Sequence, residues 1–191
     1  MDKILTTSNY GICLFSVEVL QEFLKKEKVR SKKLLALFQK DKKRYLDSQK
    51  EGVWVPFVQI DSIKYLIKLE GYDVSFNNEW EQKLEYKGFN IEIRDGLWIS
   101  DIGSLYTFNA KEFSKNEISY QTLDGKTIYS DFKYDVPSGK YLLSIKGYAR
   151  RHPLDRPNPN YGFLFSLTKV DKFEDFKNPR EEIYDFNVAH M

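Results

Sequence analysis

The sequence has little of the chemistry on which most enzymes depend. Its 191 residues include one cysteine, Cys13, and two histidines, His152 and His190. A single thiol cannot form an internal disulfide, which indicates a reducing compartment. Neither histidine has a companion at the spacing of metal ligands, so we expect no metal site.

Known catalytic and cofactor-binding motifs are absent as well. The chain has no Gly-x-Ser-x-Gly nucleophile elbow, no phosphate-binding P-loop and no glycine-rich dinucleotide fingerprint. Glu79 and Glu81 flank Trp80, as acids flank an aromatic ring in some carbohydrate-binding sites. A strand would place both carboxylates on one solvated face, whereas a glycosidase takes its pair from separate elements. We therefore predict no catalytic residue and no cofactor, and a small hydrolase remains the weakest alternative.

Long apolar runs are also missing. No window approaches the roughly 18 apolar residues that identify a membrane-spanning helix. The first ten residues are polar and do not resemble a signal peptide. We expect a cytoplasmic protein that has no membrane partner.

Charge is divided unevenly along the chain. Residues Lys25–Lys50 contain eleven basic and three acidic residues and carry +8, whereas the whole chain carries only +2. The remainder therefore carries −6. Such asymmetry is typical of a surface that meets an oppositely charged partner.

The basic segment is also periodic. Val17, Leu20 and Phe23 recur at helical spacing, and so do several leucines and aromatic residues after a break near residues 28–31. We predict two helices, or one kinked helix, over 16–49, with Ser31 as an N-cap and Gly52 as the stop. The lysines would form a solvated face or bind nucleic acid, and the predominance of lysine over arginine leaves this signal unspecific.

From residue 53 onward the apolar period changes to two. This pattern, with 27 Tyr and Phe residues, favours strands. We predict one domain over 1–191, of the α+β class and mostly β. A β-rich body at 53–188 would form an antiparallel β-sandwich or partly open barrel, beside one or two N-terminal helices. The predicted strands cover 54–60, 65–69, 89–93, 97–99, 118–121, 127–129, 140–148, 161–170 and 183–188.

Turn signals separate several of these strands. Asp95-Gly96 and Asp124-Gly125 each lie between alternating apolar runs and predict β-hairpins. Pro56 within the first run predicts an edge strand or a bulge.

One long connection, residues 150–160, holds three prolines and three arginines. Prolines stiffen such a loop and reduce the entropy lost when a partner orders it. We predict either a mobile surface loop or a loop that contacts a partner or a phosphate group. Its candidate binding residues are Arg150, Arg151, His152 and Arg156. A ribonuclease is a further hypothesis, in which His152 would be the one histidine available for acid–base chemistry.

In size, β-rich composition and lack of catalytic groups, the chain resembles the immunity proteins of bacterial toxin–immunity pairs, including those of contact-dependent inhibition. The resemblance rests on no diagnostic motif. It implies a non-catalytic protein that neutralises a cognate toxin, often a basic nuclease, by binding and occluding it. The acidic part of the chain would then be the binding surface, although the basic helical segment could instead meet an acidic partner. The candidate residues are Asp95, Asp101, Asp171, Glu174, Asp175, Glu181, Glu182 and Tyr184.

Overall fold

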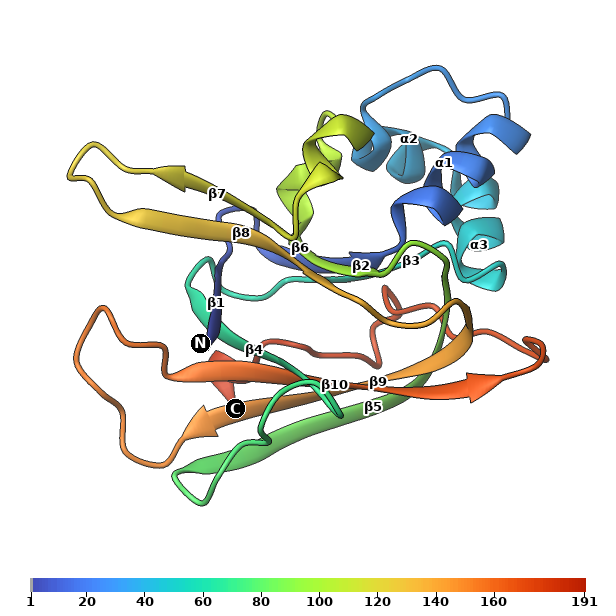
Figure 1. The fold of residues 1–191 in the computed structure, drawn as a ribbon. Helices are drawn as coiled ribbons and strands as arrows, with labels where there is room; N and C mark the ends of the chain where they lie inside the picture. The colour runs from blue at the N-terminus through green and yellow to red at the C-terminus, as the bar shows by residue number, and fades with distance from the viewer. Residues whose placement is uncertain (1) are drawn as a thin grey trace.

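The computed structural model describes residues 2–191 and contains three α-helices and ten strands within that range (Figure 1). The helices are α1 (Val17–Lys26), α2 (Leu34–Lys40) and α3 (Lys42–Lys50). The strands are β1 (Lys3–Thr6), β2 (Gly11–Phe15), β3 (Trp54–Val58), β4 (Lys64–Leu69), β5 (Trp80–Ile93), β6 (Leu97–Asp101), β7 (Glu117–Gln121), β8 (Thr127–Tyr134), β9 (Gly139–Arg150) and β10 (Tyr161–Val170). Three short 3₁₀ helices are η1 (Ile102–Leu105), η2 (Ala110–Ser114) and η3 (Val188–His190).

All ten strands belong to one mixed sheet that closes almost completely into a barrel. Nine of them follow the order β3-β2-β6-β8-β1-β4-β10-β9-β5, and β7 pairs with β8 beside this path. Figure 1 shows β8, β6, β2 and β3 facing the layer of β4, β10, β9 and β5. The prediction of a mostly β fold is confirmed, but the prediction of an antiparallel sheet is wrong at two pairs. β1 runs parallel to β8, and β10 runs parallel to β4, because these strands meet through long-range connections that alternation does not encode.

The barrel closes between its first and last strands through contacts from outside the ladder. The Glu92 backbone N–H on β5 donates to the Gly52 carbonyl, just before β3, at 2.7 Å. Gly52 has a φ of +69°, and a Cβ there would lie 2.7 Å from the Phe173 ring, so this turn requires glycine. Phe186 fills the remaining opening, with its ring centroid 5.2 Å from Phe57 of β3. The C-terminal segment, which we define as residues 171–191, thus completes the barrel wall.

The predicted strand at 183–188 is wrong. The chain there has no ladder partner within residues 2–191 and ends in η3. Phe186 and Val188 alternate as they would on a strand, but both enter the core as single plugs and are almost completely buried. Spacing alone does not separate these two arrangements.

The apolar core has two parts, separated by the wall of the barrel. Leu14 and Phe57 belong to the cluster inside the barrel, whereas Phe15, Trp54 and Trp98 belong to a second cluster on the outer face of β2, β3 and β6. The helices and η2 cover that second cluster, as Figure 1 shows. Because both faces of β2 are covered, all five of its residues are buried. A continuous apolar run of this kind lacks alternation, which is why it was not predicted as a strand.

The basic segment forms three helices rather than the one or two predicted. Ser31 is not an N-cap: Lys33 takes that position, and the Ser31 hydroxyl accepts the Lys33 N–H at 3.1 Å. α1 buries Val17, Leu20 and Phe23, as its spacing predicts. Asp41 is the N-cap of α3, and its carboxylate accepts the Arg44 N–H at 2.9 Å. This cap interrupts the helix that periodicity alone would continue.

Of the two predicted hairpins, one is confirmed and one is wrong. Asp124-Gly125 joins β7 and β8, which pair with each other. Asp95-Gly96 joins β5 and β6, but β5 pairs with β9 while β6 pairs with β2 and β8. The turn therefore carries the chain from one layer of the barrel to the other. Pro56 lies on β3, which is the first strand of the sheet, as predicted for an edge strand.

Candidate functional site

The C-terminal segment holds six of the eight predicted partner-binding residues. Asp171, Glu174 and Asp175 line one cavity of about 510 Å³, together with two lysines of the same segment. Glu181, Glu182 and Tyr184 line another cavity of about 460 Å³, together with Asp185 and His190. These six residues therefore form two clusters along one stretch of chain.

Asp95 and Asp101 do not join this surface. The Asp95 carboxylate accepts the Ser16 hydroxyl and, at 3.2 Å, the Glu18 N–H in the first turn of α1. Its negative charge therefore stabilises the start of that helix. Asp101 is buried and accepts hydrogen bonds from Ser8 and Asn9, at 3.2 Å and 2.6 Å. The prediction that Asp101 contributes to an exposed binding surface is corrected by its burial at the end of β6.

Aromatic packing fixes the C-terminal segment in place. The Tyr184 ring makes edge contacts with Tyr86 and Phe89 of β5, with centroids 5.1 Å and 5.3 Å apart. Burial raises the pKa of the Tyr184 hydroxyl. Tyr184 is half-buried, whereas its neighbour Ile183 is 71% exposed. The exposed apolar side chain of this surface is Ile183, which the sequence analysis placed at the start of a predicted strand and not among the binding residues.

Arg180 joins the C-terminal segment to the helices. Its guanidinium carbon lies 4.4 Å from the Tyr45 ring centroid on α3 and 5.4 Å from that of Trp54. The Tyr45 hydroxyl donates to the Asn178 side chain at 2.7 Å. Burial lowers the pKa of Arg180, and burial also raises the pKa of Tyr45. This cation faces aromatic rings and makes no ion pair with a residue in the range 2–191.

The acids that follow Arg180 are consequently uncompensated. Within the described part of the chain, Glu181, Glu182 and Asp185 make no ion pair. All three are exposed on either side of Ile183. The result is a fixed acidic surface with an apolar side chain at its centre.

The basic helical layer, residues 25–50, has the opposite character. Four of its cations are paired: Lys26 with Glu51, Lys43 with Asp47, Arg44 with Glu27 and Asp41, and Lys50 with Asp47. The other seven are exposed and make no ion pair with residues 2–191. They are Lys25, Lys28, Arg30, Lys32, Lys33, Lys40 and Lys42.

The loop after β9 uses its first two arginines to hold a neighbouring turn. Arg150 pairs with Glu79 at 3.1 Å, and its guanidinium lies 4.5 Å from the Trp80 ring centroid. The Arg151 side chain donates to the Asn78 carbonyl at 3.1 Å. His152 and Arg156 are exposed. The loop thus does not gather its arginines around one point where a phosphate would bind.

The carboxylates beside Trp80 also have structural partners. Glu79 binds Arg150, and Glu81 pairs with Lys83 at 2.9 Å. The hydrogen bond from Lys83 lowers the pKa of Glu81. A general acid of a glycosidase requires a raised pKa, so this pair has the wrong electrostatics for that role.

Three buried polar side chains, which the sequence did not predict as a group, lie side by side on neighbouring strands of the barrel. Cys13 of β2 lies opposite Ser100 of β6, which lies opposite Asp131 of β8. All three are fully buried, and the Asp131 carboxylate accepts the Ser104 and Ser130 hydroxyls. Burial raises the pKa values of both Cys13 and Asp131. Cys13 is therefore a protonated thiol rather than a nucleophilic thiolate, and the row is structural.

Comparisons with known proteins give no family for this chain: no family model, no curated protein and no solved structure matches it. Residues 2–191 contain no group of three or more His, Cys, Asp or Glu side chains placed to hold a metal ion. None of the helices in the same range has the length and apolar character needed to cross a membrane.

Proposed function

We propose that this protein is a non-catalytic binding module that recognises a basic protein through the acidic surface of its C-terminal segment. Its general resemblance to immunity proteins extends the proposal to a specific role, the neutralisation of a cognate toxin by occlusion. The observation that carries the proposal is the arrangement of Glu181, Glu182 and Asp185 around exposed Ile183, where none of the three acids forms an ion pair within residues 2–191.

Two physical features make this surface suited to tight binding. First, the segment is fixed by Phe186, Tyr184 and Arg180, so little conformational entropy is lost when a partner binds. Second, uncompensated carboxylates steer a basic partner, while a central apolar side chain supplies contact area that excludes water. Since Glu181, Glu182 and Asp185 form no ion pair within residues 2–191, a partner need not break ion pairs to reach them, although the Asp185 carboxylate accepts the Asn187 N–H at 2.9 Å.

Co-expression with the products of neighbouring genes, each taken as a candidate toxin, tests the proposal. E181K/E182K should abolish protection of the cell and weaken binding of the purified pair. The matched control D135K/D155K changes the net charge equally at exposed acids outside the C-terminal segment, and it should protect fully. Full protection by E181K/E182K would overturn the proposed surface, and absence of protection by the unchanged protein would overturn the proposed role.

A nucleic-acid-binding function is the second candidate, and the seven unpaired cations of the basic helical layer favour it. Contacts between lysine and phosphate release counterions, so binding would weaken steeply with added salt. An electrophoretic shift of duplex DNA or of RNA at low salt measures this directly. K32Q/K33Q/K40Q should abolish a shift that arises from this layer, and the absence of any shift with the unchanged protein would exclude the candidate.

A further inference from the structure

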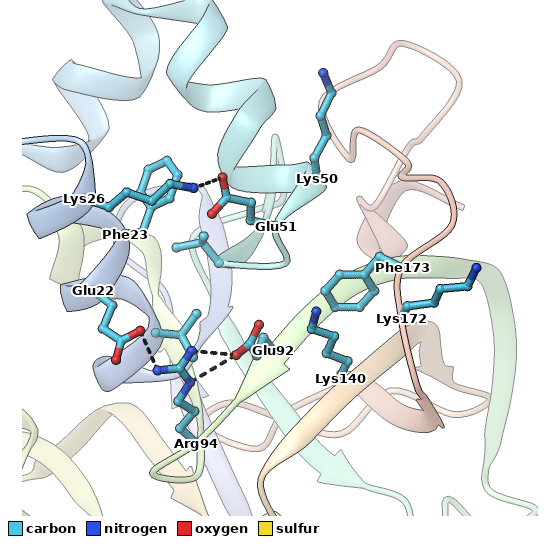
Figure 2. A pocket seen from close by; sticks show the side chains of 12 residues that line it. Glu22, Phe23, Lys26, Lys50, Glu51, Glu92, Arg94, Lys140, Lys172 and Phe173 are labelled. Carbon is cyan, nitrogen blue, oxygen red and sulfur yellow. Dashed lines mark hydrogen bonds and ion pairs between the residues drawn. The ribbon is translucent and has the colours of Figure 1, made fainter.

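Three strands lie at the ends of the mixed sheet, and two of them are covered. β3 and β5 end the nine-strand path, and the C-terminal segment and the Gly52 turn close the gap between them. Figure 2 shows a cavity of about 410 Å³ at this closure, lined by Arg94, by Lys140 of β9 and by Phe173 of the C-terminal segment. Side chains from several elements therefore surround the end of β5. The third strand, β7, pairs with β8 alone.

The outer edge of β7 presents free backbone groups. The Thr122 N–H donates to the Lys126 carbonyl at 2.9 Å, so the backbone groups of Thr122 point toward β8. Because backbone groups alternate in direction along an antiparallel pair, those of Glu117, Ser119 and Gln121 point away from β8. None of these three residues has a backbone hydrogen bond to another element of the described chain. The edge is thus a template for a further strand.

β7 also lacks the features that usually protect such an edge. Edge strands commonly carry lysine or proline, or are bent by a bulge. β3 has Pro56, whereas β7 has neither residue type. The β-bulge of the hairpin inserts Ser130 into β8 and adds no residue to β7.

The position of the hairpin makes this edge accessible. Figure 1 shows β7 and the start of β8 projecting from the sheet beyond β1. Four of the five residues of β7 are exposed, and half of the Tyr120 surface is accessible to solvent. A two-stranded ribbon is marginally stable in water, so an added strand would stabilise the projecting part.

A second copy of β7 fits the edge in an antiparallel arrangement. A two-fold axis through Ser119 pairs all five residues, with the outward N–H and C=O of Ser119 meeting those of the second Ser119. Ile118 then lies opposite Tyr120 of the second copy, and an aromatic residue opposite a β-branched one is a favourable cross-strand pair. Ile118 packs against the outer cluster, so Tyr120 of the second copy would extend that apolar surface.

The charge of β7 is compatible with this pairing. Glu117 is its one charged residue, and it forms no ion pair within the described chain. In the two-fold arrangement its carboxylate lies opposite Gln121 of the second copy, whose side-chain amide can donate a hydrogen bond to it. The two Glu117 side chains do not face each other, so pairing brings no like charges together.

We propose that this chain forms a two-fold symmetric dimer through β7, in which two hairpins make a four-stranded sheet in the order β8-β7-β7-β8. The same surface serves both copies, so the assembly closes at two. The contact is short compared with the interfaces of permanent dimers, and we expect association that depends on concentration. The acidic surface at Glu181 and Glu182 takes no part, and the dimer does not depend on that surface binding a protein.

Sedimentation velocity of the purified chain at a series of concentrations tests the dimer. The dimer fraction should rise with concentration for the unchanged protein. S119P removes an outward N–H that β8 does not use, so it should abolish the dimer while the hairpin remains. A urea denaturation curve shows whether each variant is folded.

Charge variants at Gln121 test the register. Q121E places two carboxylates opposite each other twice in the dimer and should weaken association about tenfold. Q121K places an ammonium group opposite Glu117 and should strengthen association about threefold, although it raises the net charge of each copy. E117K/Q121E exchanges the charges and should restore association. Q39E is the matched control, since Gln39 is exposed on α2, outside the pairing edge.

Three results would contradict the proposal. A chain that remains monomeric at every concentration overturns the dimer. A dimer that folded S119P leaves unchanged is not formed through β7. If Q121E and Q121K both associate as Q39E does, the register that places Glu117 opposite Gln121 is wrong.

Discussion

The basic helical layer and the acidic C-terminal segment lie on the same barrel and stabilise it in different ways. The layer and the rest of α1 pack as three short helices over the outer cluster, and four of the eleven cations of the layer are paired with Glu27, Asp41, Asp47 and the adjacent Glu51. The segment has no helix or strand before η3 and is held by single side chains, Arg180 and Phe186 above all. A surface charge can thus be presented either by a regular element or by an irregular chain fixed at a few points.

Arg180 shows how the two regions depend on each other. It is a cation of the acidic segment, yet it lies over the aromatic rings of the helical layer. Because it faces inward, the acids beside it remain free for a partner. The comparison predicts that changes at the anchoring points affect stability, whereas changes at the exposed charges affect binding.

The largest expected effect is loss of the aromatic anchors. F186A in the C-terminal segment and F38A in the helical layer should each lower the free energy of unfolding by about 3–5 kcal/mol, because each removes a buried ring and leaves a cavity. Urea denaturation measures both. I183A is the control and should change stability little, since Ile183 is exposed. Two separate unfolding transitions, or an unchanged midpoint for F186A, would show that the segment is not part of the cooperative fold.

A smaller effect is expected from charge reversal on the acidic surface. E181K/E182K should weaken the binding of a basic partner about 10- to 100-fold, through loss of attraction and added repulsion. Surface plasmon resonance at several salt concentrations should show a reduced salt dependence as well. If K32E/K33E in the helical layer has the larger effect, the two surfaces have exchanged roles and an acidic partner is indicated.

Loss of the Arg180 contact between the two regions should lower stability by less than loss of an aromatic anchor. R180A removes the guanidinium from the Tyr45 and Trp54 rings and should cost about 1–2 kcal/mol, combining lost cation–π attraction with lost packing. R156A, at an exposed arginine of the loop after β9, is the control. Equal midpoints in thermal denaturation for the two variants would argue against the anchoring role of Arg180.

The smallest effect concerns pH. Burial raises the pKa of Asp131, so the folded chain holds this proton more tightly than the unfolded chain, whose value is near 3.8. Stability is therefore lost as the pH rises from about 3.8 through the folded pKa. D131N removes this loss and should gain stability relative to the unchanged protein as the pH rises. Denaturation curves measured every half unit from pH 4 to pH 7 test the trend, and a constant or opposite difference would contradict it.

Asp124, an exposed carboxylate of the β7–β8 hairpin, should show the opposite dependence of stability on pH. The hydrogen bonds from Lys126 and Thr122 lower the pKa of Asp124 to about 2. Its contribution to stability is present above the unfolded value of 3.8 and is lost as the pH falls toward 2. D124N should therefore lose stability relative to the unchanged protein above pH 4, where D131N gains it.

Much of the strand content could be predicted from sequence, because a strand that buries one face alternates. The 161–170 strand has the bounds predicted for it, and β7 and β8 form the hairpin predicted from Asp124-Gly125. β2 was missed because both of its faces are covered, and 183–188 was predicted as a strand because Phe186 and Val188 are two residues apart. In both cases the spacing of apolar residues was a poor guide, because burial of a side chain depends on which other elements pack on each side of the chain.

For the candidate site, too, part could be predicted from the sequence and part depended on the tertiary structure. The acids of the C-terminal segment were predicted as a binding surface from composition and resemblance alone, and whether they bind a partner remains a prediction. The burial of Asp101, the helix-capping role of Asp95 and the exposure of Ile183 followed from neighbours distant in sequence. The cavity of about 410 Å³ that Arg94, Lys140 and Phe173 line has no local signal in the sequence, because α1, the end of α3, the end of β5, β9 and the C-terminal segment all supply its walls.

By itself, the sequence determined that this chain is mostly β, that its charge is divided between a basic helical stretch and an acidic remainder, and where most of its strands lie. Those properties depend on composition and on the short-range period of apolar residues. Only the tertiary structure decided that the sheet is mixed and nearly closed, that an irregular C-terminal segment completes it, and which charges remain unpaired. These follow from contacts between residues far apart in the chain, where burial and ion pairing are settled by packing rather than by local pattern.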